Sequence, residues 1–252
     1  MQASLSVVLI TQNAAQHLAK CLDSCRFADE IIVVDSGSQD DTVEIASRYG
    51  ARVIHQDWLG FGPQKQFAVS QASHDWVLCI DADEWLSEQL SINIKKILSY
   101  PQYGSYRFAR CNKFMGRFLR HGEGYPDLNL RLFDRRKAHW SNDLVHEYVF
   151  TTDEIGRIDG DLMHESGEDI ANYLTKQNRY TTLQAQILFA RRKKISTGKL
   201  VFSPVLRFIK FYFIRQGFRD GLPGFVHIVI GCMNSFVKYA KLRELYRLES
   251  TE

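Results

Sequence analysis

Four stretches in the first 80 residues are apolar at nearly every position and rich in β-branched side chains. They are 5–11, 30–35, 52–55 and 76–80. Runs of this length and composition predict strands that are buried on both faces, as in parallel sheets. Helical spacing of apolar residues follows from Asn13 to about Leu22, from Asp40 to Gly50 and from Gln64 to Ala72, with Asn13 and Asp40-Asp41 as expected caps. The alternation predicts an α/β fold with a mostly parallel central sheet flanked by helices.

Polar side chains follow three of these strands at the point where each strand ends. The segments are Thr11-Gln12-Asn13, Asp35-Ser36-Gly37-Ser38 and Asp81-Ala82-Asp83. In open α/β sheets, ligands bind beyond the carboxyl ends of the strands, so these groups are expected to share one binding edge. The chain contains no GxGxxG and no GxxxxGK[ST] pattern, which disfavours a dinucleotide-dependent dehydrogenase or a P-loop enzyme.

The pattern Asp-x-Asp occurs twice, at 81–83 and at 159–161. The second copy contains Gly160 within a polar stretch, and we interpret it as a turn. The first copy follows a buried strand, and its two carboxylates would repel each other unless a cation lay between them. Hard divalent ions prefer such oxygen ligands, and Mg²⁺ commonly combines one or two carboxylates with substrate phosphates. A solvated loop is the alternative, but the position at the binding edge favours a metal site.

Three blocks of the chain resemble the family 2 glycosyltransferases of the GT-A fold. They are 6–11, 28–42 and Asp81-Ala82-Asp83-Glu84, and the resemblance covers residues 4 to about 190. Among these enzymes, the chain most resembles bacterial lipopolysaccharide-core β-1,4-glucosyltransferases. The resemblance implies that Asp35 and the loop after the first strand hold the base and ribose of a nucleotide, and that Asp83 binds a divalent metal on the donor diphosphate. The donor-binding residues implied in this way are Thr11, Asn13, Asp35, Ser36, Gly37, Gln64, Lys65, Asp81 and Arg131.

Lys65 also has an interpretation that does not depend on the resemblance. An ammonium group suits a phosphate ligand, whereas the alternative is a solvated lysine on a helix surface.

Residues 103–165 change to short strands interleaved with arginine, glycine and aromatic residues. We expect this segment to complete the sheet and to line the acceptor cleft. In an inverting transfer the acceptor hydroxyl loses its proton as it attacks, so a carboxylate must act as general base. Asp143 and Glu147 are the candidates, and a surface ion pair is the alternative for each. The resemblance, which falls on His146-Glu147, favours Glu147.

His164 precedes a long helical stretch from about 169 to 194. A single histidine of this kind is commonly structural. The resemblance instead implies a histidine on the metal or the diphosphate. A neutral imidazole beside Asp83 would complete a mixed oxygen and nitrogen shell that suits Mn²⁺ as well as Mg²⁺.

The net charge of +3 hides a division along the chain. Residues 187–252 carry 13 lysines and arginines against 4 acidic residues, and 10 of the 31 aromatic residues lie between 200 and 250. A helix starting at Ser203-Pro204 and ending at Gly217 would have an apolar face and a basic face that includes Arg207, Lys210 and Arg215. This pattern is typical of helices that lie on an anionic membrane surface. A helix packed on the catalytic domain or in a dimer is the alternative, and nucleic acid is disfavoured because bulky apolar side chains gain nothing from phosphate.

We therefore expect a catalytic domain at 1–195, with a nucleotide-sugar half at 1–100 and an acceptor half at 103–165, and a membrane-associating tail at 196–252. The five cysteines show no CxxC or zinc-ligand spacing, so reduced thiols are expected. The sequence shows no signal-peptide pattern and no run of about 18 apolar residues. These features predict a cytoplasmic protein, peripheral on the inner face of the cell membrane.

The leading hypothesis is an inverting, metal-dependent glycosyltransferase. Its expected donor is UDP-glucose, its acceptor is a lipopolysaccharide-core or other lipid-linked saccharide, and its cofactor is Mg²⁺ or Mn²⁺. Two alternatives stay open: an enzyme that transfers sugar to a polyprenyl phosphate, and a non-catalytic nucleotide-binding membrane module.

Overall fold

The computed structural model describes residues 3–143, 147–167 and 169–250. The chain divides into two compact units, one formed by Met1–Arg110 with Asp127–Glu165 and the other by Cys111–Pro126 with Ser166–Glu252. Each unit is built from two separate parts of the chain. The sequence predicted a boundary after residue 195, where the charge changes. The helix that precedes that point instead groups with the C-terminal helices, because it packs on the last of them.

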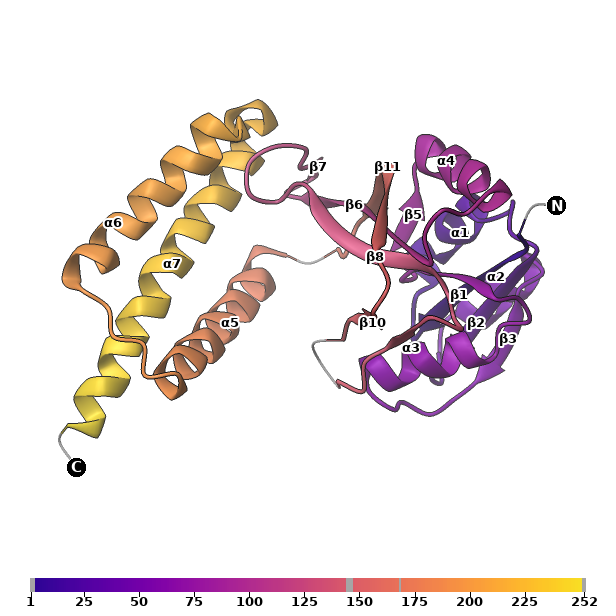
Figure 1. The fold of residues 1–252 in the computed structure, drawn as a ribbon, viewed down its shortest axis with the longest axis horizontal. Coiled ribbons are helices and arrows are strands. Elements are labelled where there is room, and N and C mark those ends of the chain that lie inside the picture. Colours follow the sequence, from indigo (N-terminus) through magenta and orange to yellow (C-terminus); the bar gives the residue numbers. More distant parts are fainter. Residues whose placement is uncertain (1–2, 144–146, 168, 251–252) are drawn as a thin grey trace. The chain divides into compact units, whose positions relative to one another are not determined.

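The four predicted strands of the first 80 residues are all present in the first unit, and three of them, β1, β2 and β3, are labelled in Figure 1. They are β1 (Leu5–Thr11), β2 (Glu30–Asp35), β3 (Arg52–His55) and β4 (Trp76–Cys79). They pair in parallel in the order β3-β2-β1-β4. Because β1 is central and buried on both faces, its sequence has no polar alternation. The carboxyl ends of these strands lie at one edge, as the sequence predicted.

The rest of the sheet is not parallel. After β4 the order continues β8-β6-β11-β5, with β8 antiparallel to β4 and to β6, and β5 antiparallel to β11. These strands are β5 (Glu84–Leu86), β6 (Ser105–Phe114), β8 (Asp127–Asp134) and β11 (Ile155–His164). Two further strands, β9 (Ala138–Trp140) and β10 (Val149–Thr151), form a small antiparallel sheet. The predicted α/β class is confirmed, but the sheet is mixed rather than mostly parallel, because β6 to β11 are not joined by helical crossovers.

Helices cover both faces of this sheet. Helices α1 (Ala15–Ser24), α2 (Thr42–Arg48) and α4 (Glu88–Ser99) contribute to one core, and α3 (Phe61–Ser70) contributes to the other. Within β1, Leu5, Val7 and Leu9 point to the first core while Val8 points to the second. The alternation follows from the two-residue period of a strand.

The start of α1 differs from the prediction that Asn13 caps it. The N-cap is Ala14, and Asn13 has a left-handed backbone with φ of 51°. The first amide groups of the helix are instead bound from the next loop, because Ala14 N donates to Thr42 Oγ1 at 2.8 Å and Ala15 N donates to Asp40 Oδ2 at 3.1 Å. The loops after β1 and β2 are therefore tied together.

The interpretation of Asp159-Gly160-Asp161 as a turn was wrong. The three residues lie inside β11, and Asp161 is buried, with its amide donating to Ser87 Oγ at 3.0 Å. Gly160 has φ of +116°, and a Cβ atom there would come within 2.6 Å of Leu90 N. Gly160 is needed because β11 and α4 approach each other closely at this point. In the sequence alone, a glycine between two aspartates looks like a turn.

The second unit is mainly helical. It contains α5 (Ile170–Ala190), α6 (Thr197–Phe208), a π-helical segment (Ile209–Ile214), a short 3₁₀ helix (Gly217–Asp220) and α7 (Gly221–Glu249), and β7 (Arg117–Phe118), which pairs with the end of β6. Helix α6 begins earlier than predicted, because Ser196, and not Ser203, caps it by accepting from Lys199 N at 3.2 Å. Pro204 lies inside the helix. The regular helix ends four residues after Pro204 and continues as the π-helical segment.

Among the described residues, one helical stretch, Gly217–Glu249, is long and apolar enough by length and composition to cross a membrane. One third of its most apolar window is buried inside the protein. This stretch contains no uninterrupted run of about 18 apolar residues, because isolated polar residues divide it. The same length and composition occur in core helices of soluble proteins.

We predict that Gly160→Ala destabilises the first unit more than Gly50→Ala does. Both glycines have positive φ, so each alanine carries a backbone cost of about 1–2 kcal/mol. Gly50 has open space around it, whereas Gly160 faces the backbone of Leu90, which adds about 1–3 kcal/mol of overpacking. Urea unfolding of both variants measures the difference. Equal midpoints would contradict the close approach of β11 and α4.

Candidate functional site

Asp35 organises the loop at the end of β2. Its carboxylate is buried, and its Oδ2 accepts from the amides of Gly37 and Ser38, both at 2.9 Å. Its Oδ1 accepts from Thr11 Oγ1 at 3.2 Å and from the Ser38 hydroxyl. Gly37 has φ of +88°, which a turn of this kind requires. Asp35 and Thr11 are thus brought together, and the carboxylate fixes the shape of the loop.

Two further predicted donor-binding residues hold this loop. Asn13 Oδ1 accepts from Gln39 N at 2.8 Å. Gln64 is fully buried, and its Nε2 donates to Ser36 Oγ at 3.0 Å and to Gln56 O at 3.2 Å. Its Oε1 accepts from Leu59 N at 3.2 Å. Gln64 therefore supports the loops after β2 and β3.

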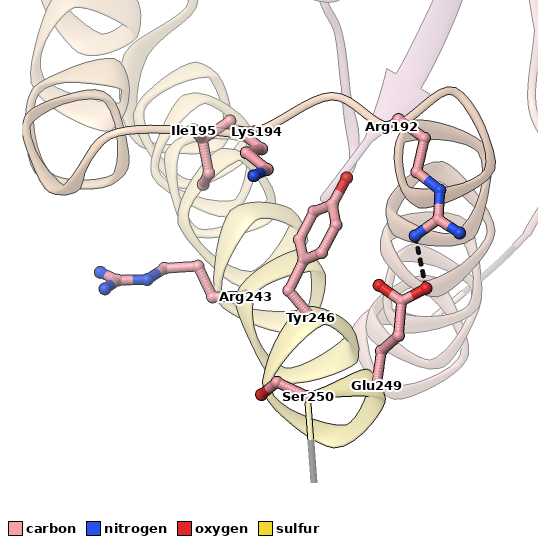
Figure 2. Close-up of a pocket in the computed structure, with 7 residues that line it drawn as sticks. All are labelled: Arg192, Lys194, Ile195, Arg243, Tyr246, Glu249 and Ser250. Carbon is pink, nitrogen blue, oxygen red and sulfur yellow. Dashed lines mark hydrogen bonds and ion pairs between the residues drawn. The ribbon is translucent and has the colours of Figure 1, made fainter. Parts of the chain in front are cut away.

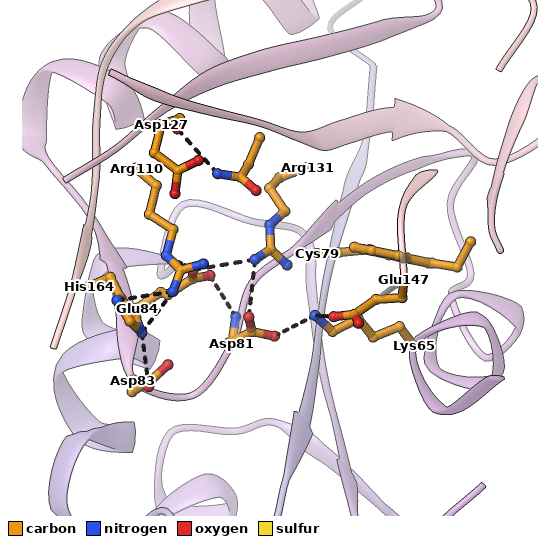
Figure 3. Close-up of polar contacts among 12 residues, drawn as sticks. Lys65, Cys79, Asp81, Asp83, Glu84, Arg110, Asp127, Arg131, Glu147 and His164 are labelled. Atoms are coloured by element: carbon orange, nitrogen blue, oxygen red, sulfur yellow. Dashed lines mark hydrogen bonds and ion pairs between the residues drawn. The ribbon is translucent and has the colours of Figure 1, made fainter. Parts of the chain in front are cut away.

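A cluster of buried charges lies beside this edge (Figure 3). Lys65 Nζ is 3.0 Å from Asp81 Oδ1, and Arg131 Nη2 is 3.0 Å from Asp81 Oδ2. Lys65 and Arg131 are only 6% and 4% exposed, so the alternative of a solvated helical lysine is wrong. Both cations also approach the ring of Trp140, at 4.8 and 5.7 Å from its centroid.

The charges in this cluster shift one another's pKa values. Burial alone would raise the pKa of Asp81, but Arg131 and Lys65 lower it well below its usual range. Burial raises the pKa of Glu84, whose Oε1 is 3.3 Å from Arg131 Nη2 and 3.2 Å from Arg110 Nε. Burial alone would lower the pKa of Arg131, but its two carboxylate neighbours raise it above its usual value. Asp81 is therefore held in its charged form.

Glu84 and Arg110 are site residues that the sequence analysis missed. Glu84 stands next to Asp83, and its full burial is the result of its place in β5. Arg110 comes from β6, and no motif marks it, because its neighbours depend on how β6 and β11 associate in the sheet. Only the Asp-x-Asp-Glu order gave a signal for Glu84.

Asp83 and His164 form a second group at the same edge. Asp83 Oδ2 is 3.2 Å from His164 Nε2, and the two side chains are 36% and 14% exposed. The pairing of β5 with β11 places His164 opposite Glu84, and Glu165 N donates to Asp83 O at 3.1 Å. Arg110 Nη2 lies 3.0 Å from both ring nitrogens of His164. The structure thus joins the two residues that the sequence proposed as metal ligands.

The spacing of this pair matches two neighbouring positions in the shell of a divalent ion, but Arg110 Nη2 lies 3.0 Å from the same His164 Nε2, so this guanidinium would have to move for a metal to bind there. Neighbouring ligands at about 2.1 Å from Mg²⁺ lie about 3.0 Å apart, close to the separation of Asp83 Oδ2 and His164 Nε2. The described residues contain no group of three or more His, Cys, Asp or Glu side chains that could hold a metal. A metal bound by this pair would therefore need further ligands, and substrate phosphates commonly supply them.

Glu147 joins the charge cluster, because its Oε1 lies 2.9 Å from Lys65 Nζ. The ammonium group of Lys65 therefore bridges Glu147 and Asp81 (Figure 3). The side chain of Asp143 is exposed, and its main-chain oxygen accepts from Gly62 N at 3.1 Å. Of the two predicted bases, Glu147 is the one that the structure brings to the cluster. His146, which precedes it, lies outside the described residues.

Residues 6–153 match the sequence model of the family described as Glycosyl transferase family 2. An uncharacterized glycosyltransferase of Rickettsia typhi is 36% identical over 96% of this chain and 87% of its own length. The lipopolysaccharide core biosynthesis glycosyltransferase LpsC of Rhizobium meliloti is 31% identical over 98% of this chain and 94% of its own length.

Among solved structures, residues 1–349 of S. aureus TarS in complex with UDP-GlcNAc are similar, with a TM-score of 0.51. The alignment covers 98% of this chain and 92% of that chain at 14% sequence identity. At this identity the likeness concerns the fold alone. Together with the family match, it confirms the GT-A fold that the sequence resemblance implied.

We predict that Arg131→Met destabilises the protein at pH 7 by about 3 kcal/mol, because Asp81 and the buried Glu84 each lose one of their two cationic partners. In the native protein the pKa of Asp81 is lowered by its cationic neighbours, so the charged carboxylate stabilises the fold at pH values above the ordinary pKa of an aspartate. This stabilisation is lost as the pH falls and the carboxylate becomes protonated. The difference between variant and native protein should therefore shrink on acidification. Arg26→Met is the control, since Arg26 and its ion-pair partner Asp23 are both exposed. Equal losses in urea unfolding would contradict the buried cluster.

Proposed function

This chain belongs to glycosyl transferase family 2, and we propose that it transfers a hexose, with glucose as the expected sugar, from a UDP-linked donor with inversion. The observation that carries the proposal is the convergence of three groups at the carboxyl edge of the parallel strands. They are the Asp35 turn, the Asp83–His164 pair and the Lys65–Glu147 bridge. This is the edge at which open α/β sheets bind ligands.

The donor would bind along this edge. The Asp35 turn, with Thr11, Asn13, Ser36 and Gly37, offers a rigid polar loop for the base and ribose. Gln64 supports that loop through its hydrogen bonds to Ser36 and Gln56. Lys65, Asp81 and Arg131 would act together, because the two cations fix the Asp81 carboxylate and place an ammonium and a guanidinium group near the diphosphate.

Asp83 and His164 would hold a divalent metal, Mg²⁺ or Mn²⁺, on the donor diphosphate. When bound, such an ion offsets the negative charge that grows on the departing nucleoside diphosphate. The 3.2 Å separation and partial exposure of the pair support this role.

Glu147 would act as the general base. The acceptor hydroxyl oxygen bonds to the anomeric carbon, the bond from that carbon to the diphosphate oxygen breaks, and the hydroxyl proton passes to a carboxylate oxygen of Glu147. Lys65 positions this carboxylate by the 2.9 Å contact. Asp143 is the alternative base.

The acceptor that we propose is a lipopolysaccharide-core or other lipid-linked saccharide. The similarity to LpsC over nearly the whole chain supports this choice. The basic, aromatic segment 196–252 would hold the enzyme on the anionic inner face of the cell membrane. Its abundance of exposed apolar side chains supports this location.

We predict that Asp83→Asn lowers turnover by at least ~100-fold and removes the Mn²⁺-dependent part of UDP binding. Asp159→Asn is the matched control, because Asp159 belongs to the other Asp-x-Asp copy and its side chain is 88% exposed. Calorimetry with UDP, with and without Mn²⁺, measures the binding. Metal-dependent binding that survives in Asp83→Asn would overturn the assignment.

We predict that Glu147→Gln lowers kcat by about 10²–10⁴-fold and leaves UDP affinity unchanged. Asp143→Asn should keep most of the activity, and the reverse pattern would make Asp143 the base. Near-full activity in Glu147→Gln would favour an acceptor that is already ionised, such as a polyprenyl phosphate, because it needs no base.

A further inference from the structure

The second unit has polar groups in its interior and many apolar side chains on its surface. Arg207 forms an ion pair with Glu123, with Nε at 3.0 Å from Oε2 and Nη2 in contact with Oε1. Both residues line a cavity of about 130 Å³. Asn234 and Gln177 line the same cavity and bind each other at 2.8 Å. Large apolar side chains that are about half exposed or more lie on the surface of α6, the π-helical segment and α7, among them Phe202, Leu206, Phe213, Ile214, Leu222 and Met233.

This distribution argues against α7 as a simple membrane-spanning helix. Asn234, Ser235 and Lys238 come from the middle of α7 and line the polar cavity. Ser235 also bonds to Ser203 of α6 at 2.6 Å between the hydroxyl oxygens. One side of α7 thus has polar partners within the protein, while Val229, Met233 and Phe236 are exposed. A helix of this kind suits the interface between water and lipid.

A shallow, open groove of about 550 Å³, called the α6 groove, runs along α6 and the start of the π-helical segment and combines both kinds of side chain. Phe202, Leu206 and Phe211 give it apolar walls, and Lys199, Arg207 and Lys210 give it positive charge. Phe202 and Leu206 are 63% and 65% exposed. Lysine and aliphatic or aromatic groups in one groove are complementary to a molecule with an anionic head and an apolar chain.

Positive charges are crowded around Arg207. Lys238 has a lowered pKa because of burial and because of the nearby Arg207 and Lys199. Glu123 offsets the charge of Arg207. An anion at the mouth of the groove would relieve the repulsion among the lysines.

We propose that the α6 groove binds anionic phospholipids, with one headgroup phosphate at Lys199, another at Lys210, and acyl chains against Phe202 and Leu206 between them. The proposal rests on the membrane location given under the proposed function and names the partner there. Of the three basic residues expected to face the membrane, Arg207 is committed to Glu123, and Arg215 donates to Tyr125 O at 3.3 Å. Lys199 and Lys210 are both exposed, so substituting them leaves those internal contacts intact.

The same unit offers a control surface (Figure 2). A second concavity of about 640 Å³ is lined by Lys194, Arg243 and Tyr246, with Arg192 paired to Glu249. Arg243 points away from Tyr246 and donates to Thr197 Oγ1 at 3.2 Å. Replacing Lys194 and Arg243 with glutamine removes the same charge as replacing Lys199 and Lys210, at a place without the phenylalanine and leucine walls.

The experiment measures partition of the full chain onto vesicles of phosphatidylcholine with 30% or no phosphatidylglycerol, as roughly physiological anionic content. Each basic residue near an anionic surface contributes about fivefold in affinity. Lys199→Gln/Lys210→Gln should therefore lose about 25-fold on the anionic vesicles, and Lys194→Gln/Arg243→Gln markedly less. Phe202→Ser/Leu206→Ser should weaken the binding that remains at high salt, whereas Val229→Ser should weaken it less.

Equal losses in the two charge variants would overturn the groove and leave only a diffuse attraction. Displacement from the vesicles by inorganic phosphate, but not by chloride at the same ionic strength, would also overturn it, because the ligand would then be a free anion. Circular dichroism checks that each variant is folded. UDP binding is measured separately and tests only the proposed function, which a native chain that does not bind UDP would contradict. Vesicle binding by the variants tests only the groove.

Discussion

The carboxylate of Asp81 is held between two buried cations, and much of the site depends on this arrangement. Lys65 comes from α3, Arg131 from β8, and Asp81 follows β4, so the contacts join the parallel and antiparallel halves of the sheet. Removing ions from water is costly unless each finds a partner, and the cost is largest when one partner is missing. The three groups are therefore constrained to lie together, and they set the positions of Glu84 and Glu147 around them.

This arrangement gives the site order before a ligand arrives. The Asp35 turn is closed by its own hydrogen bonds, and Gln64 braces it from α3. Gln64 and Lys65 are neighbours in α3. Gln64 contacts the Asp35 loop, which is proposed for the base, and Lys65 contacts Glu147, which is proposed for proton transfer. Because these side chains are already ordered before a ligand binds, less entropy is lost when donor and acceptor are aligned.

The sequence predicted the parallel strands and the binding edge because both follow from local patterns. It also predicted that residues 103–165 complete the sheet, as β6, β8 and β11 do. It did not predict their antiparallel pairing, since the pairing of β8 with β4 or of β11 with β5 joins residues distant in the chain. Single residues were misread for a similar reason. Gly160 resembles a turn signal but serves a close approach to Leu90, and Asn13 resembles a cap but occupies a left-handed loop position. Glu84 and Arg110 acquired their roles only through neighbouring strands.

The central claim is that the carboxyl edge of the parallel strands binds a nucleoside diphosphate through a metal. A crystal structure of the protein soaked with UDP and Mn²⁺ tests it most directly, because anomalous scattering locates the manganese. We predict uracil and ribose against the loop of Asp35, with manganese at the diphosphate, Asp83 and His164. Nucleotide bound elsewhere, or manganese held by other residues, would contradict it.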